Sequence, residues 1–266
     1  MKVTIIGAGN IGGAIARGLA QGSIVKAGDI TCTDRSQAIL DRLKEWNPEF
    51  GTSLDNGIAA HKADYIVLAV KPWMVQSVLE EIKSHIDYNR QVVVSVAAGV
   101  SFRELSEYLT KITTVGRSLP ALFRVIPNTA IEARSSMTFV SACNASEEQT
   151  GLILQMFNEL GTAMLVEERL MTAGTALASS GIAFALRYIR AAIEGGVELG
   201  FYPQEAQEIV VRTVKGAVDL LLTNRSNPEQ EIDRVTTPGG ITIRGLNEME
   251  LSGFTSAVIR GLKASK

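Results

Sequence analysis

Short runs of β-branched and aliphatic residues alternate with helical patterns along the first part of the chain. Between the runs, apolar side chains recur at helical spacing, as at Ala14, Ile15 and Leu19. Strands that alternate with helices in this way are typical of a mostly parallel sheet with helices on both faces. The pattern predicts a doubly wound α/β domain over residues 1–166. Its expected strands span residues 3–6, 30–33, 65–70, 91–96, 123–127, 136–141 and 162–166.

The β pattern ends after Glu167, and the rest of the chain has helical periodicity. Helices are expected over residues 168–224, over 229–235, and from about Thr242 onward. We therefore expect a second, all-helical domain over residues 167–266. Its apolar faces, AIEGGVELG and GAVDLLL, exceed what about 100 residues need for a private core, which indicates helix packing between subunits. Packing of the same faces within the chain is the alternative.

The first expected strand runs directly into the sequence GAGNIG at residues 7–12, and a helical pattern follows. In a strand–turn–helix unit of this kind, Gly7 permits the tight turn, Gly9 lets the backbone approach a pyrophosphate, and Gly12 lets the helix pack closely on the strand. The free amides of Asn10 and Ile11 at the helix start would face the diphosphate. A glycine turn with a purely structural role in another α/β protein is the alternative.

An acidic residue, Asp34, follows the second strand about 20 residues beyond the glycines, where a carboxylate would meet the ribose diol of a dinucleotide. Asp34 favours NADH, because its carboxylate accepts hydrogen bonds from both ribose hydroxyls and repels a 2′-phosphate. Arg35 and Ser36 could instead hold the 2′-phosphate of NADPH. We therefore expect NADP or NAD, in the reduced form, as the hydride donor, with use of both.

Other strand ends carry further candidate contacts, because ligands of doubly wound folds bind at the carboxyl edge of the sheet. Lys71 and Pro72 follow the third strand and either turn the chain over the cofactor or only end the strand. Small residues after the fourth strand would let a nicotinamide approach the backbone. Asn128 is a candidate substrate contact or only a turn residue. The cofactor contacts expected in these segments are Ala69, Val70, Lys71, Pro72, Ala98 and Gly99.

The most informative stretch of the helical half is VTTPGGITI at residues 235–243. Pro-Gly-Gly breaks one helix, and a helical pattern resumes at Ile243. The consecutive amides of Gly239, Gly240 and Ile241 would then lie at a helix N-terminus, which is a good carboxylate site. Thr237 and Thr242 add hydroxyls on either side. An ordinary interhelical turn is the alternative, although it needs only one glycine.

Composition excludes several classes of protein. A net charge of −2 provides no basic field for nucleic acid or for an anionic membrane. The chain enters a strand without a charged leader, and the runs at 65–70 and 92–100 are too short to span a bilayer, so we expect a cytoplasmic protein. Cys32 and Cys143 are expected to be small buried hydrophobes, and His61 and His85 show no metal-ligand pattern, so no metal site is expected.

Along nearly its whole length the chain resembles the pyrroline-5-carboxylate reductase family. The resemblance implies a Rossmann domain, NAD(P)H-dependent reduction of the cyclic imine to L-proline, and a helical domain that forms a homodimer, often within a ring of dimers. It also implies that Thr237, Gly239 and Gly240 hold the substrate carboxylate and that Thr242 reaches the imine nitrogen. The matching segments are IIGAGNIGGAIARGL, LAVKP, VSVAAGV, RVIPNT, TALASSGIA, GGVELGF and VTTPGGITIRGLNEMELSGF.

An imine substrate agrees with the residues present. Its nitrogen is protonated near neutrality, so hydride transfer requires orientation and a hydrogen-bond donor rather than a catalytic histidine. The chain departs from the family at Ile126, Ile182, Arg190 and Ile241, where the family has Met, Pro, an acid, and Thr or Ala. These departures leave two alternatives open. One is a non-catalytic NAD(P)-binding or pyridoxal-phosphate-handling relative, and the other is a Rossmann reductase, for example deazaflavin-dependent, that acts on another small substrate.

Overall fold

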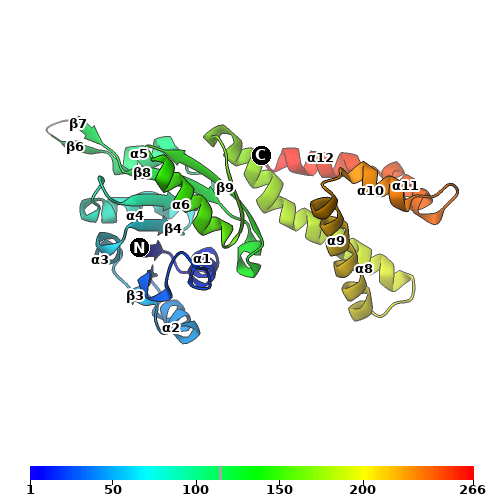
Figure 1. Ribbon diagram of the computed structural model, residues 1–266, viewed down its shortest axis with the longest axis horizontal. Helices are drawn as coiled ribbons and strands as arrows, with labels where there is room; N and C mark the ends of the chain where they lie inside the picture. The colour runs from blue at the N-terminus through cyan, green and yellow to red at the C-terminus, as the bar shows by residue number, and fades with distance from the viewer. Residues whose placement is uncertain (114–115) are drawn as a thin grey trace. The chain divides into compact units, whose positions relative to one another are not determined.

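The computed structural model describes residues 1–113 and 116–266, without the side chains of residues 112–118. The described chain divides into two compact units, Met1–Ser179 and Ser180–Lys266. Figure 1 shows the strands gathered in the first unit and only helices in the second. The mostly parallel sheet and the all-helical second part that the sequence predicts are confirmed.

The first unit is built on an eight-stranded sheet with the order β10-β9-β8-β5-β4-β1-β2-β3. Neighbouring strands are parallel except β8 and β9, which are antiparallel. The strands are β1 (Val3–Ile6), β2 (Ile30–Thr33), β3 (Gly51–Ser53), β4 (Tyr65–Leu68), β5 (Val92–Ser95), β8 (Ala121–Ile126), β9 (Ser136–Cys143) and β10 (Gly161–Leu165). A separate antiparallel pair joins β6 (Lys111–Thr113) to β7 (Gly116–Ser118). Every strand expected from an apolar run is therefore present, with ends that shift by a few residues.

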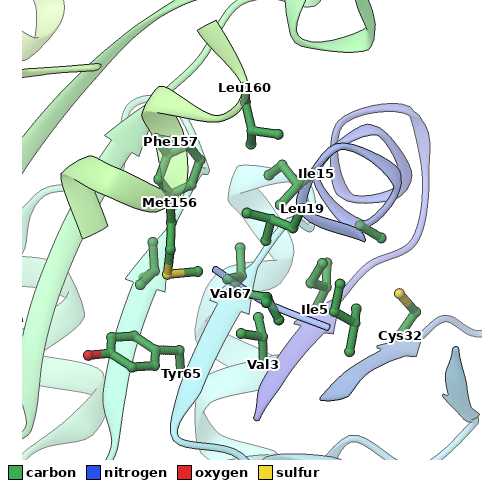
Figure 2. Close-up of a cluster of buried hydrophobic side chains, with 14 of the residues drawn as sticks. Val3, Ile5, Ile15, Leu19, Cys32, Tyr65, Val67, Met156, Phe157 and Leu160 are labelled. Atoms are coloured by element: carbon green, nitrogen blue, oxygen red, sulfur yellow. The ribbon is translucent and has the colours of Figure 1, made fainter. Parts of the chain in front are cut away.

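Helices cover both faces of this sheet. One face packs against α1 (Asn10–Ala20), α2 (Gln37–Trp46) and α6 (Glu147–Asn158). The other face packs against α3 (Asn56–Lys62), α4 (Val75–Ile82) and α5 (Phe102–Leu109). Successive strand residues point to opposite faces, so Ile5 belongs to the first cluster and Ile6 to the second. Figure 2 shows the first cluster, in which Ile15 and Leu19 of α1 lie beside strand residues and near Phe157 of α6.

Short 3₁₀ segments connect several of these elements. They span Ala27–Asp29, Pro72–Met74, Lys83–His85, Thr129–Ala133 and Glu168–Leu170. The last of them begins the transition from the sheet to the helices. It continues into α7 (Met171–Gly174) and a π-helical turn over Thr175–Ser180.

This transition segment is packed onto the first unit. Met171 is fully buried against Ile126 and Phe139, and the hydroxyl of Ser179 donates to the carbonyl of Pro127 at 3.3 Å. The compact unit therefore extends to Ser179, beyond residue 166 where the strand pattern ends. The domain limits of 1–166 and 167–266 stay a prediction.

The second unit consists of α8 (Gly181–Glu198), α9 (Pro203–Asn224), α10 (Pro228–Val235), α11 (Ile241–Leu251) and α12 (Phe254–Ala264). The single helix expected from Thr242 onward is two helices, because the chain turns at Gly253, whose φ of 82° is left-handed. Tyr188 of α8 meets Phe254 of α12 edge to face, with ring centroids 6.4 Å apart. Within this unit as described, Ala206 alone is fully buried. Leu199 and Leu251 are more than four-fifths exposed, so the unit taken by itself lacks a core.

One helical run is long and apolar enough to cross a membrane by length and composition. It covers Glu168–Glu198, with a mean hydropathy of 1.2 over its best window, of which 6% is buried. The sequence argument considered only the runs at 65–70 and 92–100 as possible spans and overlooked this one, because its apolar residues are spread over many alanines and glycines between isolated charges. A single run of this kind is weak support for a membrane span, because an apolar helix that packs on another chain passes the same test.

The start of the transition segment is held by an ion pair between a buried arginine and a partly exposed glutamate. Nη1 of Arg124, on β8, donates to Oε1 of Glu168 at 2.7 Å, and the amide of Phe102 donates to the same oxygen at 2.7 Å. The Arg124 side chain is only 9% exposed. Glu168 therefore neutralises a buried guanidinium and completes the N-terminus of α5 in one contact.

Replacing Glu168 by Ala should lower the free energy of unfolding by about 2 kcal/mol, because the buried guanidinium and the Phe102 amide both lose their acceptor. Glu167→Ala is the matched control. Glu167 pairs with Arg169 on the surface, so its loss should cost less than about 1 kcal/mol. Urea unfolding followed by circular dichroism measures both variants. Equal losses of unfolding free energy in the two variants would show that the Arg124–Glu168 pair stabilises the fold no more than a surface pair does.

Candidate dinucleotide site

A cavity of about 620 Å³ opens in the first unit at the carboxyl ends of β1, β2, β4 and β5. This is the edge at which doubly wound sheets bind ligands. It brings together most of the residues expected to contact a cofactor, from segments far apart in the sequence. The expected residues that line it are Gly7, Gly9, Asn10, Ile11, Asp34, Arg35, Ala69, Val70, Lys71, Pro72 and Ala98.

The glycine turn has the geometry that its sequence predicts. Gly7 has a left-handed φ of 95°. A Cβ at Gly12 would lie 1.9 Å from the carbonyl oxygen of Gly7, so only glycine lets α1 pack this closely. A Cβ at Gly9 would meet nothing within 4 Å, and Gly9 lines the cavity. Gly12 itself lies behind the cavity wall and does not line it.

The N-terminus of α1 is open toward this cavity. Gly9 is its N-cap, and no side chain caps the helix there. The first-turn amides of Asn10 and Ile11 have no intrahelical acceptor, and both residues line the cavity. Uncapped amides at the positive end of a helix favour a phosphate oxygen. The residues present therefore fit the pyrophosphate of a dinucleotide.

Asp34 lies at the cavity but also holds the glycine turn. Its Oδ2 accepts from the amide of Ala8 at 3.0 Å, and its Oδ1 accepts from the amide of Ser36 at 3.0 Å. The carboxylate thus ties the end of β2 to the turn after β1. Each oxygen retains a second lone pair for a ribose hydroxyl. Nη2 of the neighbouring Arg35 lies 3.4 Å from the sulfur of Met74.

Some contacts were not expected from the sequence. They are Ile6, Leu54, Asn56, Met74 and Val78, which also line the cavity. Val96 and Ala97 line it as well, and they belong to the small-residue stretch expected after the fourth strand. Asn56 accepts a hydrogen bond from the hydroxyl of Thr33 at 2.6 Å and donates to Glu81. It lies just after β3, whose sequence, GTS, has no apolar residue to mark a strand. Gly99 was expected to contact the cofactor, but it does not line the cavity.

Asn128 is engaged in local structure. Its side-chain oxygen accepts a hydrogen bond from the backbone amide of Ala130 at 3.1 Å. The backbone amide of Asn128 donates to the hydroxyl of Ser136. Its Nδ2 lies 3.4 Å from the carbonyl oxygen of Ala178. Asn128 is 6% exposed and does not line the cavity. A substrate contact through Asn128 stays a prediction.

The Pro-Gly-Gly segment of the second unit forms a tight turn before α11. Gly239 is left-handed, with a φ of 71°, and the amide of Gly240 donates to the carbonyl of Thr237 at 2.9 Å. The Gly240 amide, which was expected among the donors to a carboxylate, is instead used by the turn itself. Gly240 is the N-cap of α11 without a side-chain cap. The amides left without an intrahelical acceptor begin at Ile241 and Thr242.

Neither cysteine lies in surroundings that would favour its thiolate form. Burial raises the pKa of the Cys32 thiol to about 12 and also raises the pKa of Cys143. Among the residues described, no cluster of three or more His, Cys, Asp or Glu side chains is arranged to hold a metal ion. Arg190, where the family has an acid, pairs with Glu194 on the surface of α8. The described cavity is lined by the uncapped start of α1 together with the side chains of Asp34, Arg35 and Lys71.

The parallel sheet, the glycine turn and the cavity at its carboxyl edge define a dinucleotide-binding protein of the Rossmann class. Residues 2–99 match the family described as NADP oxidoreductase, coenzyme F420-dependent, and residues 168–266 match pyrroline-5-carboxylate reductase dimerisation. A pyrroline-5-carboxylate reductase of Dictyostelium discoideum is 35% identical over 99% of this chain and 90% of its own length. The chain belongs to the pyrroline-5-carboxylate reductase family.

Other similar proteins belong to the same family. The Methanosarcina acetivorans pyrroline-5-carboxylate reductase is 34% identical over all of this chain and 97% of its own length. A second Dictyostelium reductase is 36% identical, and the chain spans about half, 48%, of that longer protein. Among solved structures, the Coxiella burnetii reductase has a TM-score of 0.89 at 29% identity over 99% of this chain and 95% of its own. The Plasmodium falciparum pyrroline carboxylate reductase, solved with NADP bound, has a TM-score of 0.86 at 25% identity over 100% and 95%.

The two glycines of the turn should separate folding from cofactor binding. Gly12→Ala should lower the free energy of unfolding by about 2 to 3 kcal/mol, because the methyl group overlaps the Gly7 carbonyl. Gly9→Ala should leave that free energy within about 0.5 kcal/mol, because its methyl group has room. The same methyl group would project toward the pyrophosphate, so NADPH should bind about tenfold more weakly. Urea unfolding and fluorescence titration measure the two effects, and normal NADPH binding by Gly9→Ala would contradict this placement.

Proposed function

We propose that this chain reduces the cyclic imine 1-pyrroline-5-carboxylate to L-proline with a hydride from NADPH or NADH. The observation that carries the proposal is the uncapped glycine turn at a cavity of dinucleotide size, in a chain that belongs to this reductase family over its full length. The nicotinamide, when bound, supplies the hydride. The residues of this chain bind the cofactor and the imine, orient them toward each other, and supply hydrogen bonds.

Four segments would hold the cofactor. The first-turn amides at Asn10 and Ile11 bind the pyrophosphate, and Gly9 gives it room to approach. Asp34 and Arg35 lie at the ribose of the adenosine half, where the carboxylate favours NADH and the guanidinium favours a 2′-phosphate. The Ala69–Pro72 loop and the small residues that end at Ala98 and Gly99 flank the other half. Both NADH and NADPH are therefore accepted.

The turn before α11 would hold the substrate. Thr237, Gly239 and Gly240 shape it, and the free amides that follow Gly240 attract the carboxylate of the imine. The hydroxyl of Thr242 lies in the first turn of α11, where it donates to or accepts from the ring nitrogen as the imine becomes an amine. Asn128 is the further substrate contact in this proposal.

The helical unit would complete itself by self-association. It matches a dimerisation family over residues 168–266, and as described it buries almost none of its apolar side chains. A homodimer, within a ring of dimers, would cover these faces. The same burial accounts for the apolar run at Glu168–Glu198 without a membrane. A cytoplasmic location without a nucleic-acid partner agrees with the net charge of −2.

A turnover assay tests the function. When the purified chain is mixed with NADPH and 1-pyrroline-5-carboxylate, the nicotinamide absorbance should fall. The amount of NADPH oxidised should equal the amount of proline formed. A parallel reaction with reduced deazaflavin in place of NADPH should show no reduction of the imine. Binding of NADPH without any turnover would favour the non-catalytic alternative instead.

Thr242→Ala should lower kcat/KM for the imine by roughly ten- to a hundredfold, the equivalent of about 1.5 to 3 kcal/mol for one hydrogen bond to a charged or charging group. NADPH binding should not change. Thr242→Ser keeps the hydroxyl and should retain most of the activity. Unchanged turnover in Thr242→Ala would mean that backbone amides alone orient the ring, and lost NADPH binding would mean that Thr242 supports the fold.

A further inference from the structure

A π-helical turn over Thr175–Ser180 interrupts the helical run that follows the sheet. Its sequence, TALASS, lies in one of the segments that resemble the reductase family, and it has no role in the function proposed above. Turns of this kind are rare in proteins and are frequently found at functional sites. A rare backbone conformation persists only where the surrounding contacts hold it.

The residues that lead into the turn are packed tightly on β9. Met171 is fully buried against Phe139. A Cβ at Gly174 would lie 2.7 Å from Cδ2 of Phe139, so a larger residue would have to displace the ring. The hydroxyl of Thr175 donates to the carbonyl of Met171 at 2.8 Å. Apolar packing therefore fixes the start of the turn.

The end of the turn meets polar groups that follow β8. Nδ2 of Asn128 donates to the carbonyl oxygen of Ala178 at 3.4 Å. The hydroxyl of Ser179 donates to the carbonyl oxygen of Pro127 at 3.3 Å. Ser179 belongs to the turn itself, so Asn128 is the side chain of this pair of contacts that reaches the turn from the sheet.

The carboxamide of Asn128 is held in one orientation. The residue is 6% exposed, and its Oδ1 accepts from the amide of Ala130 at 3.1 Å, which caps the 3₁₀ segment Thr129–Ala133. The backbone amide of Asn128 donates to the hydroxyl of Ser136 at 3.1 Å and fixes the main chain there. Because the side-chain oxygen faces a donor, the NH₂ group points the other way and requires an acceptor. That acceptor is the carbonyl of Ala178.

Capping alone does not require an asparagine at this position. Asp, Ser and Thr also cap helices, but an ionised Asp only accepts, and a hydroxyl has its donor and acceptor on a single atom. A carboxamide carries them on two atoms that point apart. We propose that Asn128 is a positioning residue whose NH₂ group holds the π-helical turn, and that the held turn is required for efficient turnover of the imine. The second part of this inference rests on the proposed function.

Asn128→Asp removes the donor and keeps the cap, because a carboxylate oxygen still accepts from the Ala130 amide. Hydrogen exchange of the amides over residues 175–183, measured by mass spectrometry without cofactor or substrate, should become about tenfold faster, the effect of one lost hydrogen bond. Asn227→Asp is the matched control and should leave this segment unchanged. Asn227 caps α10 through the amide of Gln230 in the same way, and within the described chain its Nδ2 makes no further hydrogen bond.

Acidification supplies a readout that a general loosening of the fold would not change. A protonated carboxyl in the Asn128→Asp variant again offers both an acceptor and an O–H donor, and burial favours this protonated form. The exchange rate of the variant, compared with that of the unmodified chain at the same pH, should therefore return toward equality as the pH is lowered. Charged neighbours such as Glu132 titrate in both chains, so the comparison removes their effect.

Turnover connects the turn to the reaction. Asn128→Asp should lower kcat/KM for the imine about tenfold and leave NADPH binding unchanged, because Asn128 does not line the dinucleotide cavity. Unchanged exchange in the variant overturns the proposal, even with lower turnover, because Asn128 would then act only as a substrate contact. Faster exchange with unchanged turnover, or without recovery in acid, overturns it as well. No turnover by the unmodified chain would count against the proposed function, and exchange would still test the hold on the turn.

Discussion

The close approach of α1 to the turn after β1 is the contact on which the site depends. Gly12 packs so tightly that an added Cβ would lie 1.9 Å from the Gly7 carbonyl oxygen and 2.9 Å from the Cβ of Ala69 on the neighbouring strand end. This packing fixes the uncapped N-terminus of α1 at the carboxyl edge of the sheet. Asp34 then ties the end of β2 to the same turn through the amide of Ala8. Strand ends that are distant in sequence thus share one cavity, with backbone amides facing into it.

The two units differ in how they are stabilised. The sheet of the first unit is sandwiched between two buried clusters, whereas Ala206 is the one fully buried residue in the described helices of the second. A helical unit without a core requires another apolar surface, which agrees with its match to a dimerisation family. The ion pair between the buried Arg124 and the partly exposed Glu168 holds the point where the chain leaves the sheet. The first unit therefore supplies a rigid site, and the second supplies surfaces that association would bury.

The sequence predicted what depends on periodicity and on glycine, and missed what depends on turns and edges. Strands such as Val3–Ile6 are buried on both faces, so their apolar runs mark them. The edge strand Gly51–Ser53 has no apolar residue, and the site residue Asn56 beyond it was missed for that reason. The Pro-Gly-Gly motif marks a turn correctly, but sequence could not show that its hydrogen bond uses the Gly240 amide. Helices with apolar faces were predicted over residues 168–224, but the hydropathy of the long run at Glu168–Glu198 was not, because small residues and scattered charges dilute it.

Hydride transfer to the carbon of a cyclic imine is the central claim, and isotope labelling measures it most directly. The chain should be given 1-pyrroline-5-carboxylate and NADPH that carries deuterium at the transferable position of the nicotinamide. The account predicts proline with one deuterium on the ring carbon that was double-bonded to nitrogen, on the opposite side of the nitrogen from the carboxylate-bearing carbon. Proline without deuterium at that carbon, or no proline although NADPH binds, would contradict it.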